Sequence, residues 1–151
     1  MRVKSILNKW PPAAAHDASV IAVSRMMFAK NSGAVLIMAG GGLVGIVTDR
    51  DIVVRLLSSG LNAMDRKIEQ IMTPDPFVCF DDQKIEDAAI IMADNQVRHL
   101  PVMDSNHALA GLLTLDLIAE HYSEQLAGET LGECVERRKA RPRKPRAFLW
   151  K

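Results

Sequence analysis

The feature that most constrains the fold is an internal repeat. Residues 33–38 (Gly-Ala-Val-Leu-Ile-Met) match residues 98–103 (Arg-His-Leu-Pro-Val-Met) at an offset of 65. Residues 43–48 (Leu-Val-Gly-Ile-Val-Thr) match residues 109–114 (Leu-Ala-Gly-Leu-Leu-Thr) at an offset of 66. The extra residue falls between the paired runs, where a hairpin loop tolerates an insertion. The repeat predicts two copies of one structural unit.

The repeat also sets the boundaries that we expect. Matches continue upstream at the same offset, from Met27 with Met92 back to Ile6 with Ile71. We therefore assign residues 1–62 to the first copy and 63–128 to the second. Residues 129–151 remain as a basic C-terminal tail, which we expect to be flexible. A chain of 151 residues is long enough for two small halves that share a core.

Each copy has the pattern β-α-β-β-α. Prolines near the start of each copy disfavour helix and favour extended chain, which in the second copy leaves a short strand at 77–80. Apolar residues at three- and four-residue spacing predict helices at about 18–31 and 84–95, with N-caps at Asp17 and at Asp81 or Asp82. Hairpins follow at 34–38 with 43–47 and at 99–103 with 109–113, then helices ending near Gly60 and Gly128. The predicted fold is α+β, with two units packed sheet to sheet about a pseudo-twofold axis that creates two related clefts.

The junction between the last strand and last helix of the first copy admits two interpretations. Thr48 occupies the N-cap position, and Asp51 lies three residues later. This spacing is typical of a capping box, in which hydroxyl and carboxylate satisfy free backbone N–H groups. It also suits a phosphate-bearing ligand, because the same groups and amides meet at a helix N-terminus. Both roles can coexist.

Taken in order, these elements resemble a known family. The Ile-Met-Thr-Pro opening at 71–74, the Arg-His-Leu-Pro-Val-Met-Asp run at 98–104 and the Gly-Ile-Val-Thr-Asp-Arg-Asp run at 45–51 resemble a tandem pair of cystathionine-β-synthase (CBS) domains, also called a Bateman module. The resemblance covers about residues 1–127 and includes no catalytic domain. It implies a non-catalytic sensor that binds an adenosine-containing ligand between its repeats and signals occupancy to an effector protein. It also implies a homodimer.

The resemblance further implies which residues contact the ligand. The Thr48 hydroxyl would face phosphate, and the Asp51 carboxylate would bind the ribose hydroxyls. AMP, ADP and ATP are the implied ligands, with S-adenosylmethionine and NAD as further possibilities and no cofactor required. Around these two residues, the candidate nucleotide-binding set is completed by Arg50, Gly33, Ala34, Arg98, His99, Pro101, Thr114 and Asp116.

The second copy departs from this pattern. Leu117 stands where a ribose-binding carboxylate is expected, and Asp116 comes one residue early. One residue along a helix is about 100° of rotation, so Asp116 is poorly placed to take over the role of Asp51. We expect one complete site at Thr48 and Asp51 and a weaker or differently selective site near Thr114.

Other function classes find less support. No nucleophile–base pair, paired acids or metal-ligand spacing can be assembled, so we expect neither an enzyme nor a metal protein. Cys79 and Cys134 lack ligand spacing. No apolar run approaches the roughly 20 residues that span a bilayer, and the N-terminus lacks a signal-peptide core, so we expect a cytoplasmic protein.

The tail supports an alternative function. Residues 136–151 carry eight Lys or Arg against one Glu, a net charge of +7, whereas the rest of the chain has a net charge of −6. Such a segment is either a solvated extension or a contact for nucleic acid, an anionic membrane or an acidic partner. The alternative is therefore a dimeric structural or nucleic-acid adaptor that uses residues 136–151.

Overall fold

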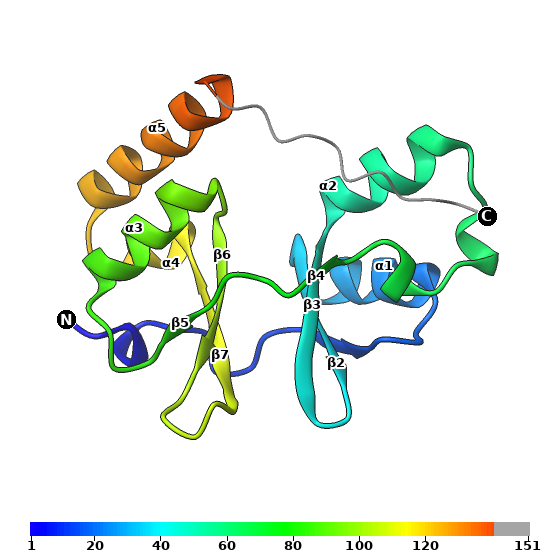
Figure 1. Ribbon diagram of the computed structural model, residues 1–151, viewed down its shortest axis with the longest axis horizontal. Coiled ribbons are helices and arrows are strands. Elements are labelled where there is room, and N and C mark those ends of the chain that lie inside the picture. Colours follow the sequence, from blue (N-terminus) through cyan, green and yellow to red (C-terminus); the bar gives the residue numbers. More distant parts are fainter. Residues whose placement is uncertain (141–151) are drawn as a thin grey trace. The chain divides into compact units, whose positions relative to one another are not determined.

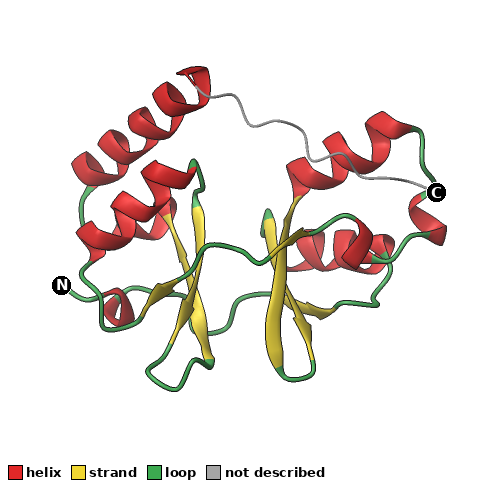
Figure 2. Cartoon of the chain, in the orientation of Figure 1, coloured by secondary structure: helices red, strands yellow, loops and turns green. Residues whose placement is uncertain are grey.

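A computed structural model describes residues 1–140 and divides them into two compact units (Figure 1). The first unit consists of residues 11–76. The second unit combines residues 1–10 with residues 77–140. Each unit contains its own sheet and its own helices (Figure 2). Each unit also has its own buried apolar cluster. The α+β class predicted from the sequence is confirmed.

The first unit is a four-stranded sheet in the order β1-β2-β3-β4, with helical segments around it. Strand β1 runs parallel to β2, and the other neighbours are antiparallel. A π-helical stretch, η2, follows the short α2 directly, and a 3₁₀ turn, η3, completes this helical segment. The elements in chain order are β1 (Ala13–Ala15), α1 (Val20–Lys30), β2 (Ala34–Ala39), β3 (Gly42–Thr48), α2 (Asp49–Asp51), η2 (Ile52–Leu56), η3 (Leu57–Ser59), η4 (Ala63–Asp65), η5 (Ile68–Gln70) and β4 (Thr73–Pro74).

The second unit repeats this plan with a three-stranded sheet, β5-β6-β7. Strand β5 is parallel to β6, and β6 is antiparallel to β7. A long helix, α5, packs against both α3 and α4. The elements are η1 (Val3–Ser5), β5 (Cys79–Phe80), α3 (Ile85–Asn95), β6 (His99–Met103), β7 (Leu109–Thr114), α4 (Leu115–His121) and α5 (Glu124–Ala140).

The predicted helix faces and hairpins are confirmed. Val20, Val23 and Met27 on α1 are buried in the core of the first unit, as the apolar spacing requires. Gly40 and Gly41 form the β2–β3 hairpin turn with φ values of +58° and +78°. Glycine adopts such positive φ values at little steric cost. Gly60, with φ of +68°, ends the helical segment that follows β3.

The segment that opens each sequence repeat packs in the unit built mainly from the other repeat. The backbone N–H of Asn8 donates to Leu112 O at 2.9 Å, and the N–H of Leu112 donates to Asn8 O at 2.9 Å. In the first unit, Thr73 of β4 pairs in the same way with Ile46 of β3. The sequence repeats at 1–62 and 63–128 therefore differ from the compact units in which parts of them lie.

A glycine permits each of these close approaches. A Cβ at Gly111 would lie 2.2 Å from the carbonyl oxygen of Asn8. A Cβ at Gly45, the matching position, would lie 2.4 Å from Met72 Sδ. Both distances are shorter than van der Waals contacts, so a side chain at either position would force its neighbour to shift. Gly45 and Gly111, which occupy matching positions of the repeat, thus allow the opening segment of the other repeat to pack beside each of them.

Three predictions about helix ends are wrong. The helix of the second copy does not end near Gly128, because α4 ends at His121 and α5 continues to Ala140. Ser19, rather than Asp17, caps α1 by accepting the Ala22 N–H at 3.0 Å. Lys84 is the N-cap of α3, without a side-chain bond, so neither Asp81 nor Asp82 has that role.

Residues 129–140 also differ from the expected flexible tail. They form most of α5, whose buried positions Ala127, Thr130 and Cys134 face the helices beneath. The three are spaced three and four residues apart, which places them in a one-sided buried stripe on an otherwise charged helix. Residues 141–151 of the predicted tail lie outside the described part of the chain. Within residues 1–140, no helix is long and apolar enough to cross a membrane.

Candidate functional site

The turn between β3 and α2 is a reciprocal cap. The Thr48 hydroxyl oxygen accepts the Asp51 backbone N–H at 3.2 Å. The Asp51 Oδ2 accepts the Thr48 backbone N–H at 2.9 Å. The capping-box interpretation of this spacing is therefore confirmed.

The cap leaves unused hydrogen-bonding sites on the side chains of Thr48 and Asp51. The Thr48 oxygen uses a lone pair in the cap, so its O–H proton can still donate to an anionic oxygen. An ionised carboxylate offers about four lone-pair sites, of which the Thr48 N–H occupies one at Asp51. The Asp51 side chain is 18% exposed. A ligand oxygen or hydroxyl can therefore engage the turn without dismantling the cap.

The start of β2 lies beside this turn. Ala34 is the register partner of Thr48, and the Asp49 N–H donates to Gly33 O at 2.9 Å. A Cβ at Gly33 would lie 3.3 Å from Asp49 Oδ2, so glycine keeps the space next to this carboxylate open. Arg50 follows in the turn with an exposed side chain. The structure thus brings five predicted site residues together at one end of the β2–β3 hairpin: Gly33, Ala34, Thr48, Arg50 and Asp51.

The second unit contains a matching turn with different side chains. Thr114 accepts the Leu117 N–H at 3.2 Å, and the Leu115 N–H donates to Arg98 O at 3.1 Å. His99 is the register partner of Thr114. Arg98, His99 and Thr114 therefore gather at this hairpin end as Gly33, Ala34 and Thr48 do at the other.

Two further predicted site residues of the second unit are less well placed to contact a ligand at this turn. Asp116 is exposed on the first turn of α4, outside the Thr114–Leu117 cap. Pro101 is buried in the middle of β6, where it is paired with Leu112. Pro101 therefore lies within the sheet and not at the polar turn.

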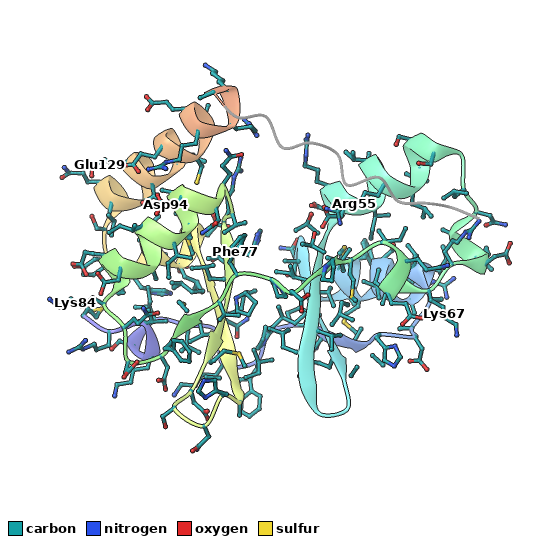
Figure 3. The ribbon with its side chains drawn as sticks, in the orientation of Figure 1. Arg55, Lys67, Phe77, Lys84, Asp94 and Glu129 are labelled. Carbon is teal, nitrogen blue, oxygen red and sulfur yellow. The ribbon has the colours of Figure 1, made fainter. Side chains whose placement is uncertain are left out.

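Sequence reasoning missed Arg55. Its Nη2 lies 3.3 Å from Asp51 Oδ1, and its Nη1 donates to the carbonyl oxygen of Ile71 at 2.8 Å. Figure 3 labels this side chain on the helical segment after β3. The i,i+4 spacing of Asp51 and Arg55 was a usable signal, because such pairs meet on one helix face. The contact with Ile71 had no signal in the local sequence.

Burial and a hydrogen bond displace three pKa values in the second unit. Burial raises the pKa of the Cys79 thiol to about 12, so this cysteine stays protonated and unreactive. The Tyr122 hydroxyl donates to the Glu86 carboxylate, which lowers the pKa of Glu86 and raises the pKa of Tyr122. Within residues 1–140, no group of three or more His, Cys, Asp or Glu could hold a metal ion.

Comparison with known proteins decides the family. The CBS domain model matches residues 3–58 and again residues 68–124. The chain belongs to the CBS domain family. CBS domain-containing protein YhcV of Bacillus subtilis (strain 168) is 28% identical over 130 residues, which are 85% of this chain and 91% of YhcV. The two matched segments reproduce the repeat seen in the sequence.

Other similar proteins differ in length and context. CBS domain-containing protein CBSCBSPB5 of Arabidopsis thaliana is 33% identical over 77% of this chain, but the match is 21% of that protein. The chain therefore spans about a fifth of this longer relative. The CBS domain pair of protein MJ0100, solved with 5′-methylthioadenosine and S-adenosyl-L-methionine, is 27% identical, with a TM-score of 0.73 over 83% of this chain and 98% of that one.

Proposed function

We propose that this chain is a non-catalytic sensor that binds an adenosine-containing ligand at the β3–α2 turn. The observation that carries the proposal is the junction of Thr48, Asp51 and the open backbone at Gly33. The Thr48 O–H would donate to phosphate, and the Asp51 carboxylate would accept from the two vicinal ribose hydroxyls. The backbone at Gly33 and Ala34 would line the ligand, with Arg50 beside it. The two adenosine-containing ligands bound by the MJ0100 pair support this class.

The turn at Thr114 would be the weaker or differently selective site. It retains a hydroxyl, and Arg98 and His99 add donors for an anionic group. Leu117 replaces the ribose-binding carboxylate, and the exposed Asp116 points from a different position on the helix. The difference between the two turns predicts unequal occupancy.

A thermal-shift panel of AMP, ADP, ATP, NAD and S-adenosylmethionine tests the proposal. A ligand at about 100 times its dissociation constant should stabilise the folded chain by roughly 2.7 kcal/mol. Asp51→Ala should remove most of the response, whereas Asp116→Ala should retain most of it. If no adenosine compound raises the melting temperature, the proposed function is wrong.

Binding of the ligand would be signalled to an effector protein through a homodimer. Ligand can transmit a signal only if it binds two arrangements of the protein with different affinity. The helices of the first unit expose large apolar side chains, with Phe28 at 90%, Val53 at 55% and Leu57 at 61%. The positions that match Phe28 and Val53 in the second unit are Ala93, which is 2% exposed, and the partly buried Ala119. These small residues lie on α3 and α4, which α5 covers.

We therefore assign the dimer contact to the helices of the first unit that expose Phe28, Val53 and Leu57. Phe28→Ser should shift the chain toward monomer in light scattering after size exclusion. Ile90→Ser is the matched control, since Ile90 is 58% exposed on α3 of the other unit. Equal behaviour of the two variants would refute this assignment.

The adaptor alternative depends on the basic end of the chain. Arg138 and Lys139 are exposed at the end of α5, and residues 141–151 lie outside the described part. Truncation after Ala140 removes five basic residues and keeps the buried face of α5. A salt-dependent affinity for nucleic acid that this truncation abolishes would favour the adaptor. Unchanged AMP binding by the truncated chain would favour the sensor.

A further inference from the structure

Arg55 connects the Asp51 carboxylate to a backbone carbonyl from a distant part of the chain. Its guanidinium lies 3.3 Å from Asp51 Oδ1 through Nη2 and donates to Ile71 O through Nη1 at 2.8 Å. The side chains of Arg55 and Asp51 are 17% and 18% exposed. An ion pair between two largely buried side chains holds its geometry better than a pair in open solvent, where water and side-chain entropy compete.

The two contacts fix the orientation of the carboxylate. Oδ2 of Asp51 accepts the Thr48 N–H, and Oδ1 faces Arg55. Because each oxygen has a separate partner, the carboxylate plane cannot rotate without losing one of them. Each oxygen keeps a second lone-pair direction, so the carboxylate presents two adjacent acceptors in one fixed plane. That arrangement matches the two adjacent O–H donors of a ribose diol.

The second turn shows that the helix start does not need this pair. Thr114 caps α4 through the Leu117 N–H, with the same bond length of 3.2 Å as the Thr48 cap. At the positions that match Asp51 and Arg55, the second copy has Leu117 and His121. The carboxylate and its arginine are therefore absent together, while the Thr cap is kept. The pair must have a role beyond starting the helix.

We propose that Arg55 is a positioning residue that holds Asp51 for recognition of the ribose hydroxyls. This inference rests on the proposed adenosine-ligand site, and it identifies the ribose as the part of the ligand that the Asp51–Arg55 pair recognises. Ile71 O anchors the arginine on its far side, so the carboxylate keeps its place when the ligand is absent. The site is thus organised for the sugar before binding, which reduces the cost of ordering it.

Calorimetric titration of the full chain with AMP and with 2′-deoxy-AMP tests the inference. A hydrogen bond to a charged group corresponds to about tenfold or more in affinity, so the wild-type chain should prefer AMP over 2′-deoxy-AMP by about that factor. Arg55→Met should reduce that preference to near unity, and it should weaken AMP more than 2′-deoxy-AMP, which keeps only the 3′-hydroxyl. Arg55→Lys should restore part of the preference. Arg25→Met, at an exposed position on α1, is the matched control and should behave as wild type.

Each outcome has a distinct meaning. A general structural role for Arg55 would weaken AMP and 2′-deoxy-AMP equally, and that result would overturn the inference. If the wild-type chain binds AMP but does not distinguish it from 2′-deoxy-AMP, the inference fails while the proposed function stands. If the wild-type chain binds no AMP, the proposed function for this ligand and the inference on it fail together.

A graft into the second turn keeps the inference testable if Arg55→Met does not fold. His121 and Ile6, which matches Ile71 in the repeat, line the same hollow of about 340 Å³, so an arginine at 121 has room to approach that backbone. In an Asp51→Asn background, Leu117→Asp with His121→Arg should restore a preference for AMP over 2′-deoxy-AMP. Leu117→Asp alone should restore less. Equal results for the single and double grafts would contradict a positioning role for the arginine.

Discussion

Gly111→Ala tests whether the N-terminal segment is an integral part of the second unit. The added Cβ would lie 2.2 Å from Asn8 O and 2.4 Å from Leu7 Cδ1. Backbone atoms cannot move aside as a flexible side chain can, so the segment must shift away from β7. The two hydrogen bonds between Asn8 and Leu112, both 2.9 Å long, would lengthen or break.

The size of the effect follows from these contacts. Overpacking typically costs about 1–3 kcal/mol, and each of the two weakened hydrogen bonds adds about 1 kcal/mol, so we expect a loss of about 3–5 kcal/mol in the free energy of unfolding. Urea unfolding followed by circular dichroism measures this loss. Gly45→Ala should cost less, because its nearest contact is the end of the flexible Met72 side chain.

Gly128→Ala is the control for the glycine substitutions. A Cβ at Gly128 meets no atom within 4 Å, and the residue lies inside α5. Replacing a helical glycine by alanine stabilises by up to about 1 kcal/mol. If Gly111→Ala is as stable as the wild-type chain, the packing of residues 1–10 described above is wrong.

Four further predictions concern thiols, caps and surface charge. Cys79 and Cys134 are buried, so a thiol reagent at pH 8 should label neither in the native chain and both in urea. The pKa of Cys79 rises from 9.0 to about 12 on folding, so the thiol loses its proton at a lower pH in the unfolded chain than in the folded chain. The free energy of unfolding should therefore fall as pH rises from 9 toward 12, and it should fall less steeply in Cys79→Ala. Thr48→Ala and Thr114→Ala should each cost about 1 kcal/mol in urea unfolding, and no loss would contradict the caps. Arg137→Ala should cost less than about 1 kcal/mol, because its ion pair is half exposed; a larger loss would mean that it anchors α5.

The repeat made most of the fold predictable from sequence. A hairpin and an amphipathic helix are local patterns, so their positions followed from alternation and from three- and four-residue spacing. The Thr48–Asp51 cap was predictable for the same reason, since its partners are three residues apart. The placement of Gly33 beside Thr48 was implied by the family resemblance, and the structure explains it by the hairpin register that pairs Ala34 with Thr48.

Contacts between distant residues could not be predicted in this way. The Arg55 contact with Ile71 spans 16 residues, and the pairing of Asn8 with Leu112 spans most of the chain. No local pattern marks either pair, since each depends on which segment the folded sheet brings alongside. Helix α5 was missed because its composition is polar and its buried stripe is narrow. The cap at Ser19 was missed because Asp17 offered an equally good side chain two residues earlier.

The most direct test of the sensor account is an amide chemical-shift map of the full chain on addition of AMP. The account predicts that the largest shifts fall at residues 33–34 and 48–51 and are lost in Asp51→Ala. Asp116→Ala should keep them. Shifts confined to other surfaces, or an unchanged map in Asp51→Ala, would contradict ligand binding at the β3–α2 turn.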